Sequence, residues 1–84
     1  MRSLKTIVVD DEFMARESVI KLLNTYCKNI QIIGEASNID DAERLILSQK
    51  PDLAILDIRM PGGTGFELLQ RFQNINFNII FITA

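Results

Sequence analysis

The chain has 84 residues, with 9 Lys and Arg against 11 Asp and Glu, a single Cys and no His. This length allows one small domain, and a hydrophobic content of 48% is enough for a globular core and too high for a disordered chain. The net charge of −2 gives no general attraction to nucleic acid or anionic lipid. One Cys and no His exclude an internal disulfide and a thiolate or histidine metal cluster, which leaves carboxylates, hydroxyls and hard cations for chemistry.

The sequence predicts neither a membrane span nor a secretory signal. Its longest apolar runs, at residues 53–56 and 79–82, hold four residues each. A membrane helix needs about 20 such residues. The short apolar stretch near the start, at residues 7–9, runs directly into three acidic residues, unlike a signal peptide. We therefore expect a cytoplasmic protein without membrane contact.

The first half of the chain alternates strand and helix patterns. Residues 4–9 form an apolar run that is typical of a parallel strand buried on both faces. Residues 30–36 predict a second strand, in which Gln31 and Glu35 indicate an edge position. Between these runs, residues 13–27 predict a helix whose inward face holds Ala15, Val19, Leu22, Leu23 and Tyr26.

The second half repeats this alternation. A helix is expected over residues 39–49, with Asn38 as its N-cap, Pro51 just beyond its end and three inward residues, Ala42, Leu45 and Ile46. A buried strand follows at residues 53–56. Next, Thr64-Gly65-Phe66-Glu67 fits a capping box at the start of a third helix with an apolar stripe of Leu68, Leu69 and Phe72. Residues 77–83 predict a fourth strand, again nearly all apolar and expected to be buried on both faces.

The βαβαβαβ order predicts an open parallel sheet with helices on both faces, in which ligands bind at the carboxyl ends of the strands. Polar residues stand at those ends: Asp10 and Asp11 after the first run, Asp57 after the third and Thr83 at the end of the fourth. If the first and third strands are neighbours, the three aspartates converge. Glu12, which comes next, is interpreted as an acidic residue at a helix start.

Three converging carboxylates require a cation or a proton. Two of them about 4 Å apart repel by about 4 kcal/mol at an effective dielectric constant near 20. Mg²⁺ fits this all-oxygen set best. Each element alone also has an ordinary structural reading, as a helix cap, a turn or a strand end. The glycine-rich loop at residues 60–65 contains no Walker motif, so nucleotide binding is not expected.

Three segments together give the chain a recognisable pattern. They are Ile7-Val8-Val9-Asp10-Asp11-Glu12, Pro51-Asp52-Leu53-Ala54-Ile55-Leu56-Asp57-Ile58-Arg59-Met60-Pro61 and Ile80-Phe81-Ile82-Thr83-Ala84. Over the whole chain the sequence strongly resembles the receiver domain of two-component response regulators. The resemblance implies a flavodoxin-like, three-layer α/β/α fold with the sheet order 2-1-3-4, the family's fifth strand being missing.

The resemblance also implies roles for individual residues. Asp57 would be the phosphoacceptor, and Thr83 the switch hydroxyl that moves onto the phosphoryl group, with Ala84 as its small neighbour. Mg²⁺ would be bound by Asp11, Asp57 and the backbone carbonyl of Arg59, while Asp10 would act mostly through water. The phosphoryl group would come from a sensor histidine kinase or a small-molecule donor, and the domain itself would not be an enzyme.

A family member would continue beyond Ala84 with a fourth helix, a fifth strand and a fifth helix. Residues 1–84 therefore resemble a partial receiver domain. We expect this polypeptide to be unstable or to self-associate, because its fourth strand would be an uncovered apolar edge. DNA binding would need a C-terminal output domain. The sequence around Asp57 is most similar to that of receiver domains in LytTR-type transcription regulators.

Two alternatives stay open from the sequence. A Mg²⁺-dependent phosphohydrolase could also use Asp57 as its nucleophile, although haloacid-dehalogenase-like enzymes usually carry Asp-x-Asp where this chain has Arg59. The other alternative is a receiver-like interaction module that is not phosphorylated. The complete acidic set argues against that second alternative.

Overall fold

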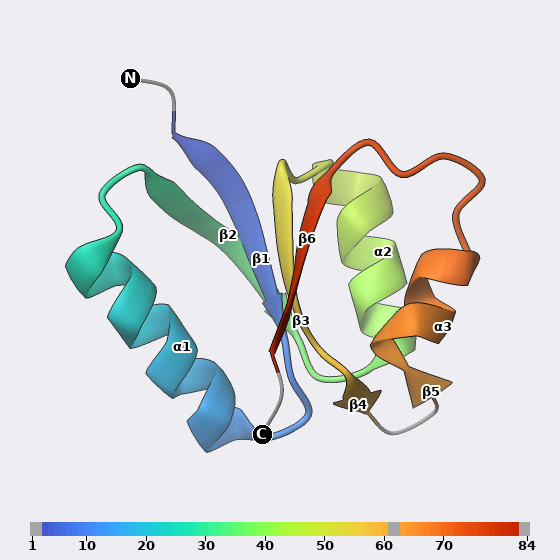
Figure 1. The fold of residues 1–84 in the computed structure, drawn as a ribbon, viewed down its shortest axis with the longest axis horizontal. Helices are drawn as coiled ribbons and strands as arrows, with labels where there is room; N and C mark the ends of the chain where they lie inside the picture. The colour runs from blue at the N-terminus through green and yellow to red at the C-terminus, as the bar shows by residue number, and fades with distance from the viewer. Residues whose placement is uncertain (1–2, 61–62, 83–84) are drawn as a thin grey trace.

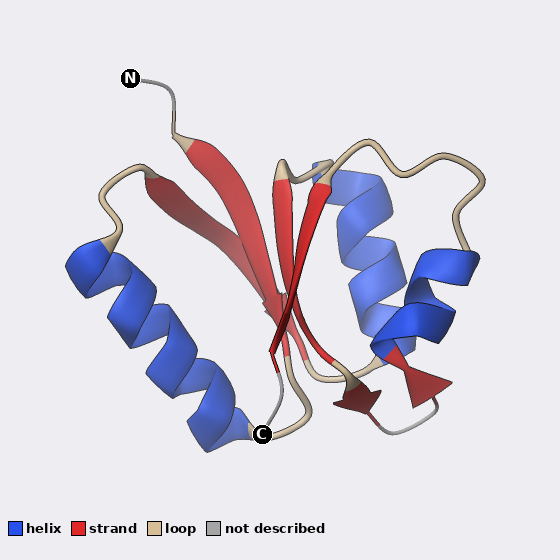
Figure 2. Ribbon diagram, in the orientation of Figure 1, coloured by secondary structure: helices blue, strands red, loops and turns tan. Residues whose placement is uncertain are grey.

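The computed structural model describes residues 3–60 and 63–82 of the chain. Its main sheet has four parallel strands in the order β2 (Ile30–Ala36), β1 (Leu4–Val9), β3 (Leu53–Asp57) and β6 (Asn78–Ile82) (Figure 1). Helix α1 (Phe13–Tyr26) covers one face, and α2 (Ile39–Gln49) and α3 (Gly65–Gln70) cover the other (Figure 2). This arrangement confirms the predicted three-layer fold. It also confirms the predicted strand order 2-1-3-4, in which the fourth strand is β6. Within the described ranges, no helix is long and apolar enough to cross a membrane.

Strand periodicity divides the core into two layers. Ile7 and Val9 of β1, with Leu56 of β3, belong to the larger cluster on the side of α2 and α3. The alternate residues, Val8 of β1 and Ile55 of β3, belong to a second cluster with residues of α1. Because successive side chains of a strand point to opposite faces, the two central strands are buried on both sides, as predicted.

The predicted starts of α2 and α3 are confirmed by side-chain caps. Asn38 Oδ1 accepts a hydrogen bond from the backbone N–H of Asp41 at 2.8 Å. Thr64 Oγ1 accepts one from the N–H of Glu67 at 3.2 Å. Each cap satisfies a backbone donor that has no partner within the helix. Arg71, at the end of α3, also links the two helices. Its guanidinium donates to the α2 residues Asp40 at 2.8 Å and Glu43 at 2.9 Å.

The predicted inward face of α1 is partly wrong. Leu22 is 58% exposed and Tyr26 is 76% exposed. The apolar residues of α1 that pack against the sheet are Val19, Ile20 and Leu23. Since Ile20 lies inward, the buried stripe is rotated away from Leu22, and Tyr26 sits at the last residue of the helix.

The last described strand was the subject of two expectations, of which one is confirmed. Its apolar run predicts burial on both faces, which is wrong, whereas the resemblance predicts an uncovered apolar edge. Strand β6 stands at the edge of the described sheet, where Ile80 is 51% exposed. An apolar run does not distinguish a central strand from an edge strand, because position in the sheet decides burial. A small antiparallel pair that the sequence did not predict, β4 (Arg59–Met60) with β5 (Gly63–Thr64), lies between β3 and α3 (Figure 1).

Candidate functional site: an acidic cluster at the carboxyl end of the sheet

Asp10, Asp11 and Asp57 come together at the carboxyl end of the sheet. Strands β1 and β3 pair in register up to Val9 and Leu56, so the next residues, Asp10 and Asp57, lie at the same level. One carboxylate oxygen from each of the three aspartates lies within 4.8 Å of the other two. The predicted convergence, which depended on β1 and β3 being neighbours, is therefore confirmed.

Asp10 is the most constrained member of the cluster. It is only 8% exposed, and its N–H donates to the carbonyl of Ala36 on β2 at 3.1 Å. Its Oδ1 accepts from the N–H of Glu12 at 3.0 Å. Burial raises the pKa of the Asp10 carboxyl, and the neighbouring charges of Asp57 and Asp11 raise it further, against the Glu12 hydrogen bond that lowers it. Burial first, and the two neighbouring carboxylates second, therefore disfavour the ionised form of Asp10.

Asp57 is half-buried at the last position of β3. Its Oδ1 accepts a hydrogen bond from the N–H of Arg59 at 3.4 Å, across the turn that leads into β4. Arg59 is exposed, and the predicted role of its carbonyl as a ligand stays a prediction. The Asp57 carboxylate therefore lies between the buried residues of β3 and the exposed Arg59.

Two glycines hold the loop after Asp57 in place. Gly63 has φ = 151°, a conformation that side-chain-bearing residues rarely adopt. At Gly65, a Cβ would lie 2.9 Å from the backbone oxygen of Asp57 and 3.0 Å from Cε1 of Phe81. A glycine-rich loop allows the backbone to approach a ligand closely. At Gly65 the close approach is instead to the backbone of Asp57 itself.

Two of the residues singled out from the sequence, Thr83 and Ala84, lie outside the described residues. The strand that leads to them is described up to Ile82, which is the register partner of Asp57. The role predicted for Thr83 stays a prediction.

Arg16 is a site residue that the sequence analysis missed. Its guanidinium donates from Nη1 to the carbonyl oxygen of Asp10 at 2.7 Å and from Nε to the carboxylate of Glu35 at 2.7 Å. The signal was a charged residue on the inward stripe of a helix, at four residues before Ile20 and three before Val19. The sequence alone did not name its partners.

The donor set fits a hard divalent cation such as Mg²⁺. It consists of carboxylate oxygens, without sulfur or nitrogen ligands, in one partly exposed cluster. Asp10 and Asp11 from the β1–α1 turn, with Asp57 from β3, are the residues that could hold such an ion.

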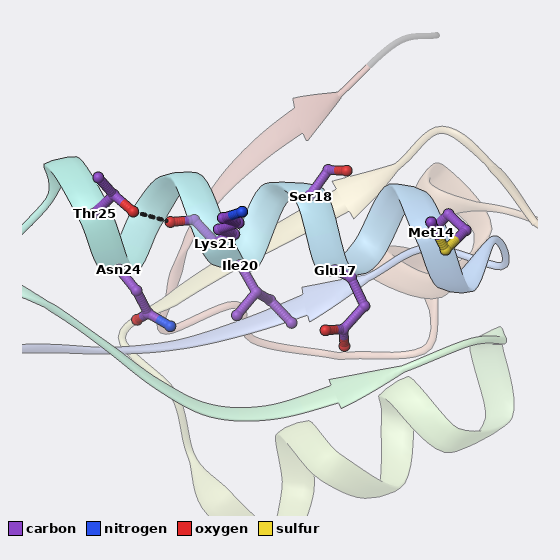
Figure 3. A pocket seen from close by; sticks show the side chains of 7 residues that line it. All are labelled: Met14, Glu17, Ser18, Ile20, Lys21, Asn24 and Thr25. Carbon is purple, nitrogen blue, oxygen red and sulfur yellow. Dashed lines mark hydrogen bonds between the residues drawn. The ribbon is translucent and has the colours of Figure 1, made fainter.

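A separate hollow of 530 Å³ runs along α1 and does not include the three aspartates. Figure 3 shows the side chains that line it, with the hydroxyl of Thr25 donating to the carbonyl of Lys21 at 2.7 Å. The lining residues are Met14, Glu17, Ser18, Ile20, Lys21, Asn24 and Thr25. The acidic cluster, and not this hollow, contains the chemistry expected from the sequence.

Comparison with known families identifies the domain. The model of the response regulator receiver domain matches residues 6–84. The chain belongs to the response regulator receiver family. The resemblance inferred from the sequence is confirmed, and the acidic cluster lies in a receiver domain of two-component systems.

Relatives of this receiver domain include regulators and solved receiver structures. The sensory transduction protein LytT of Bacillus anthracis is 40% identical over 84 residues, which cover 96% of this chain and 33% of that protein. The signal receiver domain of the response regulator NarL from Mycobacterium tuberculosis superposes with a TM-score of 0.89 at 30% identity, covering 100% of this chain and 68% of that one. A LuxR-family DNA-binding response regulator from Staphylococcus aureus superposes with a TM-score of 0.85 at 33% identity. The match covers 95% of this chain and 68% of that one. The receiver domain thus spans about a third of the length of the curated relative.

Proposed function

We propose that Asp57 is the phosphoacceptor of this receiver domain and that Mg²⁺ is its cofactor. The observation that carries the proposal is the convergence of Asp10, Asp11 and Asp57 within 4.8 Å at the carboxyl end of the sheet. An acceptor carboxylate beside two further carboxylates is suited to phosphoryl transfer, because that reaction needs positioning and charge neutralisation more than covalent chemistry from the protein.

In the proposed reaction a carboxylate oxygen of Asp57 attacks the phosphorus of the donor. The P–N bond of a phosphohistidine, or the P–O bond of a small-molecule donor, breaks, and its electron pair leaves with the donor. Asp11, Asp57 and the carbonyl of Arg59 would hold Mg²⁺, with Asp10 acting mostly through water. Bound Mg²⁺ would neutralise negative charge on the phosphoryl oxygens. The hydroxyl of Thr83 would then move onto the new phosphoryl group.

The partners follow from this reaction. The phosphoryl donor would be a sensor histidine kinase, since the chain has no His of its own. The DNA-binding response regulator from Staphylococcus aureus supports an output through DNA, by a domain outside these 84 residues. A cytoplasmic location and self-association through the β6 edge are parts of the same proposal.

The test uses the full-length protein that carries this chain. It is incubated with Mg²⁺ and acetyl phosphate, or with the phosphoryl mimic beryllofluoride, and followed by intact-protein mass spectrometry and by release of phosphate. We expect one phosphoryl group per chain in the wild type, none in Asp57→Asn and an unchanged level in Asp40→Asn, whose exposed carboxylate lies on α2. Steady turnover of organic phosphates would favour the phosphohydrolase, and no modification at all would favour an interaction module.

A further inference from the structure

Arg16 connects three elements at the carboxyl end of the sheet. It belongs to α1, donates to the carbonyl of Asp10 after β1, and donates to the carboxylate of Glu35 on β2, each at 2.7 Å. Its side chain is only 12% exposed, whereas that of Glu35 is 40% exposed. The centroid of the Phe13 ring lies 5.6 Å from Cζ of Arg16, within range of a cation–π contact. The guanidinium is therefore held from several sides and does not extend into solvent.

The contact with Asp10 acts on the backbone between the first two aspartates. The carbonyl oxygen of Asp10 belongs to the peptide group that joins Asp10 to Asp11, and this group is planar. Holding the oxygen fixes the orientation of that plane, and with it the direction in which the chain leaves toward Asp11. The N–H of Asp10 is held by Ala36 and its Oδ1 by the N–H of Glu12. The hydrogen bond from Arg16 fixes the other backbone polar group of Asp10, its carbonyl oxygen.

The contact with Glu35 aims the guanidinium. Glu35 pairs in register with Val8 of β1, two residues before Asp10, so its strand is fixed relative to the aspartate turn. An arginine presents several N–H donors in a rigid planar fork, so that Nε can bind one acceptor while Nη1 binds another. A lysine at this position has a single charged nitrogen on a flexible stem and does not reproduce that fixed geometry.

We propose that Arg16, aimed by Glu35, is a positioning residue for the cation site: it fixes the Asp10–Asp11 peptide so that the two carboxylates face Asp57. The proposal rests on the proposed function, because it assigns Arg16 a part in the Mg²⁺ site and hence in phosphorylation of Asp57. Arg16 touches neither a ligand oxygen nor the acceptor in this arrangement. Its effect is exerted through the backbone.

The experiment measures the rate of modification by acetyl phosphate as a function of Mg²⁺ concentration in the full-length protein. Removing a residue that orients metal ligands typically weakens metal affinity or activity by about 10- to 100-fold. For Arg16→Met we expect the half-saturating Mg²⁺ concentration to rise by about tenfold, with a plateau rate within about twofold of wild type. We expect a smaller rise in Arg16→Lys, and a rise in Glu35→Ala, which leaves the guanidinium without its carboxylate.

Two controls separate positioning from a general loss of stability. Arg44→Met removes an exposed arginine of α2 that pairs with Asp41, away from the cluster. Val19→Ala removes packing between α1 and the sheet, and its Tm is compared with that of Arg16→Met in the absence of Mg²⁺. Both controls should keep the wild-type Mg²⁺ dependence, even where Val19→Ala lowers the Tm as much as Arg16→Met does.

The outcomes distinguish this inference from the proposed function. If the wild type requires Mg²⁺ but Arg16→Met has the same half-saturating concentration, the positioning role is wrong and the proposed function stands. An equal rise in Val19→Ala would also overturn it, since the effect would then follow stability alone. A wild type that is not modified, or is modified without Mg²⁺, would overturn both.

Discussion

The buried carboxyl of Asp10 makes the acidic cluster sensitive to pH and to cations. Burial and the charges of Asp57 and Asp11 raise its pKa above the ordinary value of 3.8, so the folded chain holds this proton more tightly than the unfolded chain does. Ionised Asp10 therefore lowers the free energy of unfolding. This contribution is absent at low pH, where both states are protonated, and develops as the pH rises from about 3.8 through the raised pKa. Without Mg²⁺ it is fully present only at pH values above the raised pKa.

The first prediction follows from the destabilising effect of ionised Asp10 on the folded state. In the full-length protein at pH 7 without Mg²⁺, we expect Asp10→Asn to have a higher Tm than wild type, because it removes the buried charge while an amide oxygen can still accept from Glu12. The difference should shrink as the pH falls toward 3.8 and wild-type Asp10 becomes protonated. The same variant should bind Mg²⁺ about tenfold or more weakly.

Thermal melts over a pH series, with and without Mg²⁺, check this prediction. Glu17→Gln is the matched control, because it removes one exposed carboxylate from α1 and should change neither the Tm nor Mg²⁺ binding appreciably. An Asp10→Asn variant less stable than wild type at pH 7 without Mg²⁺ would contradict the account of Asp10 as a strained carboxylate.

Among the helices, α2 depends on its side-chain cap. Asn38 Oδ1 accepts from the N–H of Asp41, and its amide donates to the Asp41 carboxylate at 3.0 Å. We expect Asn38→Ala to lower the free energy of unfolding by about 1 kcal/mol, whereas Asn38→Ser keeps an acceptor and should lose less. Urea denaturation followed by circular dichroism measures both. Equal losses in the two variants would mean that the side-chain acceptor is not what stabilises the start of α2.

The junction of β3 and α3 gives a third prediction. In Gly65→Ala the new methyl group would meet the backbone oxygen of Asp57 at 2.9 Å, and backbone at this point cannot move without shifting the site. We expect a loss of about 1–3 kcal/mol, as for overpacking, together with slower modification of Asp57.

Gly34→Ala is the matched control for Gly65→Ala. Its methyl group would meet Cδ1 of Leu45 at 2.8 Å, the far end of a flexible side chain that can turn aside. We therefore expect a smaller loss of stability and a normal rate of modification. If the two variants behave alike, the close approach of Gly65 to Asp57 is not important for the site.

At the scale of the whole molecule, the two faces of the sheet are covered unequally. Helices α2 and α3 lie on one face, and α1 lies on the other (Figure 2). Ile80 on the edge strand β6 and Phe66 on α3 are both about half exposed. An edge strand with exposed apolar side chains is a template for pairing with another chain.

The fourth prediction concerns the 84-residue polypeptide by itself. At micromolar concentration we expect it to sediment as a dimer or larger species, or else to lack a cooperative melting transition. Ile80→Lys should reduce association, because a charge on an edge strand opposes pairing. Leu22→Lys, at an exposed position of α1, should not. Analytical ultracentrifugation makes the comparison, and a wild-type monomer that melts cooperatively would contradict this expectation.

Local patterns in the sequence determined the elements of this protein and most of its site. Alternation and helical spacing predicted the four strands, Asn38 and Thr64 marked helix starts, and Asp10, Asp11 and Asp57 were identified as polar ends of apolar runs. These features succeed because strand burial and helix capping depend on residues close together in the chain. The family motif then supplied the strand order that brings the aspartates together.

Only the tertiary structure decided how those elements meet. The exposure of Leu22 and Ile80 depends on where α1 and β6 stand against the sheet, and no local pattern encodes that position. The contacts of Arg16 with Asp10 and Glu35 join a helix to two strands, and the close packing of Gly65 on Asp57 joins the start of α3 to the end of β3. Such contacts form between residues that folding brings together, so the sequence supplied the side chains and the packing of the sheet selected their partners.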